Sequence, residues 1–240
     1  MSQHADRAQA LTSLLQLAAP PIAIGFHAAR PSSPPPFDAP MPERTEDGRT
    51  GRVPAGCVFW MHAVDRGFTT AAEDHGNCSV GSYTHGFIPL SEAATRGDVA
   101  AIVEAGWVAE SDFGGIPAVA EPPAAITYEP LAQAEHGDVV LVRLAAAGLM
   151  TLLDAWPALR IEGKPQCHIV AMAHEHGEVA ASVGCALSRA RTGMPLTEAT
   201  AAIPVGRLDE VIERLRVAAQ ANVTVARYAG VDAARFEPVA

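Results

Sequence analysis

Apolar residues recur along the chain either at helical spacing or in short unbroken runs. The clearest helical pattern spans residues 208–228, where Leu208, Val211 and Leu215 fall on one face. Similar spacing predicts helices at residues 5–18, 56–66, 91–107, 145–155 and 166–173. Short apolar runs predict strands at residues 22–26, 68–72, 139–143, 179–183 and 201–205. This alternation favours an α/β or α+β fold, a single layered domain over residues 1–240 with a mixed sheet flanked by helices.

Two polar segments interrupt this pattern. Residues 29–55 are rich in proline and then in charged residues and glycine. Such a composition predicts a long loop, either mobile or serving as a lid. Residues 73–86 are polar and punctuated by glycine, and no regular element is predicted there.

The composition is that of a globular protein rather than a disordered one. Of 240 residues, 49% are hydrophobic and 18% are charged. The 27 acidic residues outnumber the 17 basic ones, among which Lys164 is the only lysine, and the formal net charge is −10. This charge argues against nucleic acid and anionic membranes as partners. Because no signal peptide or membrane-spanning run is recognisable, we expect a soluble cytoplasmic protein, for which a homodimer is allowed.

The chain has four cysteines: Cys57, Cys78, Cys167 and Cys185. They are too few for a disulfide scaffold but enough for one metal site, and in the cytoplasm they remain thiols. They contain no C-x-x-C pair, so the spacing of a zinc finger is excluded. Thiolates suit zinc, iron or an iron–sulfur cluster if the fold brings the four together. Each cysteine taken alone can equally be a small buried apolar residue.

His75, Asp74 and Arg189 are the candidates for catalysis, and His85 and Arg191 lie near them in the sequence. His75 and His85 flank Cys78, and Asp74 stands where it can orient the His75 imidazole or accept a proton. Arg189 follows Cys185 closely and can lower a thiol pKa or bind an anion, as can Arg191. The simpler alternatives are a helix cap for Asp74 and a solvated loop charge for each arginine.

Several short motifs together carry a family resemblance that spans most of the chain. They are Pro21-Ile22-Ala23-Ile24, Cys57 with Ala63 and Gly67, Cys78 with Val80-Gly81, Cys167, Ser182-Val183-Gly184-Cys185 with Arg189, and Ala202-Ile203-Pro204. In this order the chain resembles the bacterial and archaeal family called domain of unknown function 169. The family typically has Cys-Pro at the second cysteine, where this chain has Cys78-Ser79. It also has a second cysteine in the last motif, where this chain has Ser188.

The resemblance implies a compact α/β domain and places all four cysteines in family motifs, but it names no function. Our leading hypothesis is that Cys57, Cys78, Cys167 and Cys185 converge on a metal centre, first a [4Fe–4S] cluster. Zinc is second, with His75, His85 or His168 replacing one cysteine. The protein would then be a redox protein or a small-molecule enzyme. One alternative is a cofactor-free thiol enzyme, with Cys78 or Cys185 as nucleophile and His75 or His85 as base. The other is a small-molecule binding or sensor protein closed by the proline-rich loop.

Overall fold

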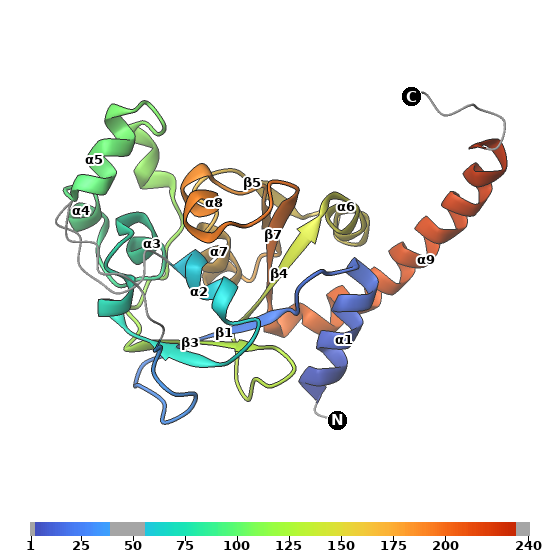
Figure 1. The fold of residues 1–240 in the computed structure, drawn as a ribbon, viewed down its shortest axis with the longest axis horizontal. Coiled ribbons are helices and arrows are strands. Elements are labelled where there is room, and N and C mark those ends of the chain that lie inside the picture. The colour runs from blue at the N-terminus through green and yellow to red at the C-terminus, as the bar shows by residue number, and fades with distance from the viewer. Residues whose placement is uncertain (1–2, 39–55, 234–240) are drawn as a thin grey trace.

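A computed structural model describes residues 3–38 and 56–233, and these form a mixed sheet covered by helices on both faces (Figure 1). Within the described residues the sheet has seven strands in the order β2-β3-β1-β4-β7-β6-β5. The strands are β1 (Ile22–His27), β2 (Phe68–Thr70), β3 (Ala125–Pro130), β4 (Val139–Ala145), β5 (Arg160–Glu162), β6 (Ala180–Ser182) and β7 (Glu198–Pro204). Only the β5–β6 pair among these strands is parallel. The predicted α/β fold with a mixed sheet is therefore confirmed.

The helices divide between the two faces of the sheet. One face carries α1 (Gln3–Leu15), α6 (Ala146–Ala155) and α9 (Leu208–Ala233), which pack on one another. The other face carries α2 (Gly56–His62), α3 (Ser79–Thr84), α7 (His168–His176) and α8 (Ala186–Thr192). Beside α3 lie α4 (Leu90–Ala93) and α5 (Gly97–Glu104); short 3₁₀ turns occur at Ala72–His75, Glu110–Gly115 and Val205–Arg207.

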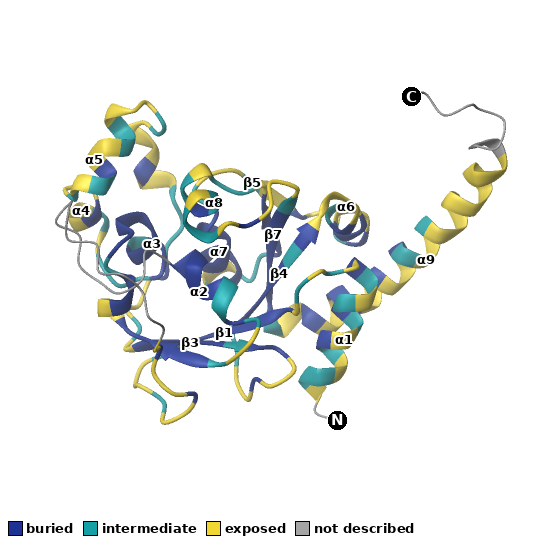
Figure 2. Ribbon diagram, viewed as in Figure 1, coloured by how far each residue is buried: buried dark blue, intermediate teal, exposed yellow. Residues whose placement is uncertain are grey.

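Strand β4 shows how the sheet separates two hydrophobic cores. Val139 and Leu141 belong to the core under α2, α3 and α7, whereas Val140 and Val142 belong to the core under α1, α6 and α9. Successive strand residues point to opposite faces, so an unbroken apolar run serves both cores at once. Figure 2 shows the central strands buried over most of their length. The first of these two cores contains three of the four cysteines.

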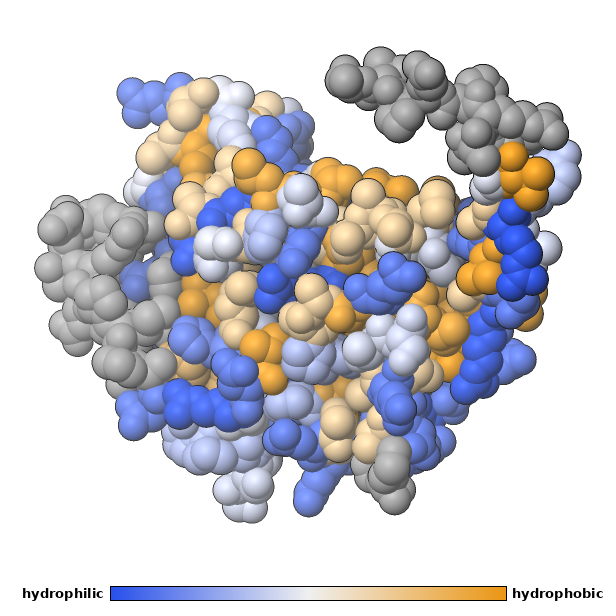
Figure 3. Space-filling model, turned by 45° about the vertical axis from the view of Figure 1, so that its right-hand side comes forward, coloured by the Kyte–Doolittle hydropathy of each residue, from blue (hydrophilic) through white to orange (hydrophobic). Residues whose placement is uncertain are grey.

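Helix α9 extends beyond the body of the fold (Figures 1 and 2). Its first half is anchored by the fully buried Leu208, Val211 and Leu215, while Val225 and Tyr228 in its second half are exposed. In Figure 3 apolar and polar residues alternate along this projecting part. Among the described residues, no helix, α9 included, combines the length and apolar character needed to span a bilayer.

Most elements with a strong local pattern fall where they are predicted, with ends shifted by a few residues. The predicted helix at 91–107 is divided into α4 and α5. Strands β3 and β5 and helices α3 and α8 are not predicted from the sequence. In the proline-rich segment, Phe37 is buried and donates its backbone N–H to Thr69 at 2.8 Å, so the start of the segment packs on β2. Residues 39–55 of the predicted loop lie outside the described residues.

Candidate functional site

Each cysteine lies at the N-terminus of a different helix on the same face of the sheet. Cys57 is the second described residue of α2, Cys78 is the N-cap of α3, Cys167 precedes α7, and Cys185 is the N-cap of α8. The backbone N–H groups at a helix N-terminus carry a partial positive charge. Four such ends are therefore oriented around the cysteines.

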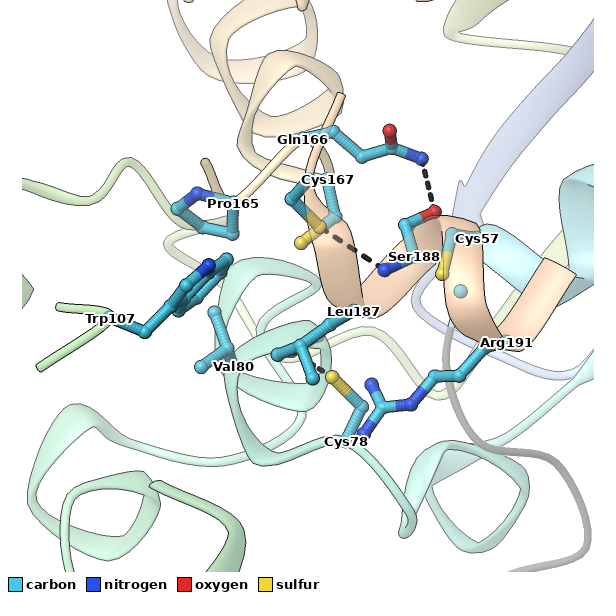
Figure 4. A pocket seen from close by; sticks show the side chains of 13 residues that line it. Cys57, Cys78, Val80, Trp107, Pro165, Gln166, Cys167, Leu187, Ser188 and Arg191 are labelled. Carbon is cyan, nitrogen blue, oxygen red and sulfur yellow. Dashed lines mark hydrogen bonds between the residues drawn. The ribbon is translucent and has the colours of Figure 1, made fainter. Parts of the chain in front are cut away.

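The four cysteines line one small cavity, which is shown in Figure 4. All four are free thiols; Cys57, Cys78 and Cys167 are buried and Cys185 is half-buried. The cavity encloses about 30 Å³, which is room for one or two water-sized groups. The fold thus brings together four residues of which the first, Cys57, and the last, Cys185, lie more than a hundred positions apart in the sequence.

Backbone amides contact two of the sulfur atoms. The Gly81 N–H donates to Cys78 Sγ at 3.4 Å, and the Ser188 N–H donates to Cys185 Sγ at 3.3 Å. In each case the donor lies three residues after the cysteine, the position that an N-cap side chain normally satisfies. These hydrogen bonds hold each sulfur atom at the start of its helix.

Ser188 stands where the resembling family has a second cysteine, and it faces the same site. Its hydroxyl accepts a hydrogen bond from the Gln166 amide at 2.6 Å, which joins the start of α8 to the segment before α7. The side chain of Ser188 also hydrogen-bonds Cys57. The serine therefore keeps a polar contact at this position without supplying a fifth thiol.

Burial dominates the electrostatics of the thiols. It raises the pKa of Cys57 to about 12, and the neighbouring Cys78 adds to the rise. The hydrogen bond from Ser188 and the charge of Arg191 oppose this effect without cancelling it. Burial likewise raises the pKa of Cys167 well above its usual value. Without a bound cation, Cys57 and Cys167 are therefore protonated at neutral pH.

Behind the cysteines lies Tyr128 of β3, a residue for which the sequence contains no signal. Tyr128 is fully buried, and its hydroxyl has no hydrogen-bond partner among the described residues. Its pKa is raised well above the usual value, first by burial and then by the nearby Cys57 and Cys167. An uncharged hydroxyl donor is thus held next to two of the four thiols.

Trp107 covers the cavity from another direction and was likewise not singled out by the sequence pattern as a site residue. Its ring lines the cavity, and the single lysine of the chain, Lys164, holds it in place. The Lys164 ammonium lies 4.5 Å from the centroid of the Trp107 ring and donates to the Trp107 carbonyl. This cation–π contact fixes an apolar wall beside the sulfur atoms.

The candidate histidines lie outside the described lining of the cavity. His75 is buried among aromatic rings, 4.7 Å from Phe59 and 4.6 Å from Phe87 between centroids, and its Nε2 lies 3.1 Å from the Thr70 hydroxyl. His85 donates from Nδ1 to the Gly81 carbonyl at 2.8 Å. Burial lowers the pKa of His85 to about 4 and that of His75 well below its usual value. Both rings are therefore neutral at pH 7.

Asp74 and Arg189 have contacts that fix the backbone. The Asp74 carboxylate accepts the Ala71 N–H at 2.9 Å and so caps the 3₁₀ turn that ends at His75. Arg189 donates to the carbonyls of Val183 and Glu198 at 2.8 and 2.7 Å, and also to that of Pro195. Arg189 therefore secures the loop before α8, and neither residue is part of the described cavity lining.

The fold and the site define a class: an α/β protein with four free cysteines gathered at helix N-termini on one face of a mixed sheet. The chain belongs to the DUF169 family, whose model, described as uncharacterised ArCR, matches residues 10–214. The matched segment includes all four cysteines. No curated protein and no solved structure matches the chain.

Proposed function

We propose that the four cysteines bind a metal centre, and that this centre is a [4Fe–4S] cluster. The observation that supports the proposal best is that four free thiols from four separate helices line one cavity. Four cysteine thiolates are the usual ligands of such clusters. A bound cluster would supply one-electron chemistry, so the protein would be a redox protein or a small-molecule enzyme. A cytoplasmic location, where thiols stay reduced, belongs to the same proposal.

The electrostatics of the site support a bound cation rather than free thiolates. Backbone amides donate to the sulfur atoms of Cys78 and Cys185, and the helix ends beside them carry a partial positive charge. The raised pKa values of Cys57 and Cys167 show that burial outweighs such effects in the metal-free protein. A metal ion deprotonates coordinating thiols outright, because its charge replaces the protons.

The donor set fits a metal centre, but its arrangement must change on binding. Within residues 3–38 and 56–233, no group of three or more His, Cys, Asp or Glu side chains is already placed to hold a metal ion. The cavity is also small compared with a cluster. Binding would therefore require the cysteine side chains to change their present arrangement.

The alternatives have less support in the described geometry. Zinc held by four cysteines uses the same donors, whereas zinc with a histidine ligand would need His75, His85 or His168 to enter a lining to which none of them contributes. A thiol enzyme would need a base near its nucleophile. His75 and His85, the proposed bases, lie outside the lining.

The test is anaerobic purification followed by visible absorption and by iron, sulfide and zinc analysis. We expect visible sulfur-to-iron absorption with iron and sulfide in equal amounts. Substituting Ser for Cys57, Cys78, Cys167 or Cys185 should abolish it, whereas Ser13→Ala, at an exposed residue of α1 on the other face of the sheet, should retain it. If the purified protein contains zinc and no iron, the proposed cluster is refuted and the zinc site takes its place. Colourless, metal-free protein with four titratable thiols would overturn the proposal.

A further inference from the structure

A second cavity opens beside the cysteine site. It shares Cys78, Val80, Leu187 and Arg191 with the first cavity and continues along α5. Its volume is about 220 Å³, several times that of the cysteine cavity and enough for a small organic molecule. Figure 4 shows Leu187 and Arg191 reaching from α8 toward Cys78, where the two cavities meet.

The walls of this second cavity are mostly apolar. Val80, Ala101, Ile102 and Leu187 line it from three helices, α3, α5 and α8. Aliphatic groups of this kind favour a ligand with an aliphatic body, because burying its apolar surface removes it from water.

Arg191 supplies the cavity's positive charge. Within the part of the chain that the structure describes, its guanidinium forms no hydrogen bond and no ion pair. Its charge acts to lower the pKa of Cys57. Its neighbour Arg189, by contrast, donates to three backbone carbonyls. An arginine with all its donors available, on the wall of an apolar cavity, is suited to a carboxylate, which it can bind through two parallel hydrogen bonds.

Asp98 is the acidic residue of the same lining, and its carboxylate is already held. One oxygen accepts the Ser79 N–H at 2.9 Å and the other accepts the Ser79 hydroxyl at 2.6 Å. No ion pair joins Asp98 to Arg191 among the described residues. Asp98 therefore fixes the start of α3 and leaves the guanidinium for a ligand.

We propose that this cavity binds a small aliphatic monocarboxylate, with its carboxylate on Arg191 and its apolar body against Val80, Ile102 and Leu187. The ligand would lie next to Cys78, which both cavities share. Binding at this position does not require the cysteine site to hold a metal, because none of the proposed contacts is made by a thiol.

Isovalerate is a suitable probe, with isovaleramide as its uncharged counterpart of nearly equal shape. Isothermal titration calorimetry on the protein as purified anaerobically should show saturable binding of isovalerate and none of isovaleramide over the same range. Acetate should bind about fiftyfold more weakly than isovalerate, because it lacks three of the carbons of the apolar body. Phosphate should not compete at the concentration of isovalerate that saturates.

Two variants and one control test the placement. Arg191→Gln should weaken isovalerate binding by about tenfold or more, because it removes the charge and the paired donors. Ala101→Leu should also weaken it by filling the cavity from an exposed position. Arg216→Gln on α9, whose arginine pairs with Glu213 at 2.9 Å, should leave binding unchanged.

The outcomes separate this inference from the proposed metal centre. Equal binding of isovaleramide, unchanged binding in Arg191→Gln, or no binding at all would overturn the carboxylate site, whatever the metal content. If phosphate displaces isovalerate, the site recognises anions in general and the aliphatic specificity is refuted. Arg191-dependent binding to a metal-free preparation would support the inference and overturn only the metal proposal.

Discussion

The first glycine of α2 offers a sharp test of how closely the cysteine site is packed. A Cβ atom added at Gly56 would lie 2.7 Å from Cε1 and 2.9 Å from Nε2 of His85. The His85 ring cannot easily retreat, since it is fully buried, donates to the Gly81 carbonyl at 2.8 Å and lies 5.4 Å from the His75 ring. We therefore expect Gly56→Ala to displace the start of α2, and with it Cys57.

The magnitude follows from two opposing effects. Alanine in place of glycine in a helix is worth about 0.5–1 kcal/mol, whereas overpacking a buried contact costs about 1–3 kcal/mol. The net prediction for Gly56→Ala is a loss of about 1–2 kcal/mol in the free energy of unfolding. Gly97, the first residue of α5, is the matched control, because a Cβ there would meet nothing within 4 Å.

Urea unfolding of both variants measures this difference, and metal analysis of the same samples tests the displacement of Cys57. We expect Gly97→Ala to be neutral or slightly stabilising. Gly56→Ala should be less stable and should lose most of any bound metal. If Gly56→Ala matches Gly97→Ala in both measurements, His85 does not form the rigid wall inferred here.

Three further predictions concern neighbours of the site. Burial lowers the pKa of His85 from the unfolded value of 6.5 to about 4 and lowers the pKa of His75 well below 6.5, so the unfolded state binds more protons. Stability should therefore fall as pH drops from about 6.5 toward 4, by up to about 1.4 kcal/mol per pH unit for each ring, and His85→Gln should flatten this dependence in urea titrations. Arg189→Gln should cost about 1–3 kcal/mol of unfolding free energy by removing donors to three carbonyls, while Arg191→Gln should cost little; equal losses would contradict the different roles of the two arginines. Tyr128→Phe should not lower stability, because the hydroxyl has no partner among the described residues, but it should lower the reduction potential of a bound cluster in redox titration. An unchanged potential would place the hydroxyl out of reach of the sulfur atoms.

Strands β1, β2, β4, β6 and β7 and the helices on the face with α9 could be predicted because their patterns are local. In β4 the residues that face the two cores alternate, and in α9 Leu208, Val211 and Leu215 follow the helical period. Each such pattern identifies an element without knowledge of its partners. Strand β5 lacks one, since Arg160 and Ile161 are exposed, and so it could not be predicted.

The two helices missed beside the site, α3 and α8, are short and lack the usual start signal. Ser, Thr, Asp or Asn normally occupies the N-cap, whereas here Cys78 and Cys185 accept the amide hydrogen bonds. The glycines and serines of both segments are also typical of turns. Because cysteines that line the cavity replace the usual N-cap residues, the sequence carries no clear signal for the two helices that position them.

The sequence could not distinguish Arg189 from Arg191, because their difference arises from tertiary contacts. Gly184 has a left-handed backbone with φ of +98°, and a Cβ there would lie 2.8 Å from the Arg189 guanidinium. This turn directs Arg189 onto backbone carbonyls, while Arg191, farther along α8, faces the cavities. The closeness of both arginines to Cys185 in the sequence indicated that this segment lies near the site, but not that Arg191 rather than Arg189 lines the cavities.

Burial connects the two proposed binding sites. It makes Cys57 and Cys167 poor nucleophiles, since their pKa values are raised, and it makes the thiolates of these two residues depend on a bound cation. Arg191 carries a charge of the same sign as that cation and lines both cavities. A carboxylate on Arg191 and a metal centre on the cysteines would both lie beside Cys78 and Leu187, which line both cavities. Any reaction between them would take place at this boundary.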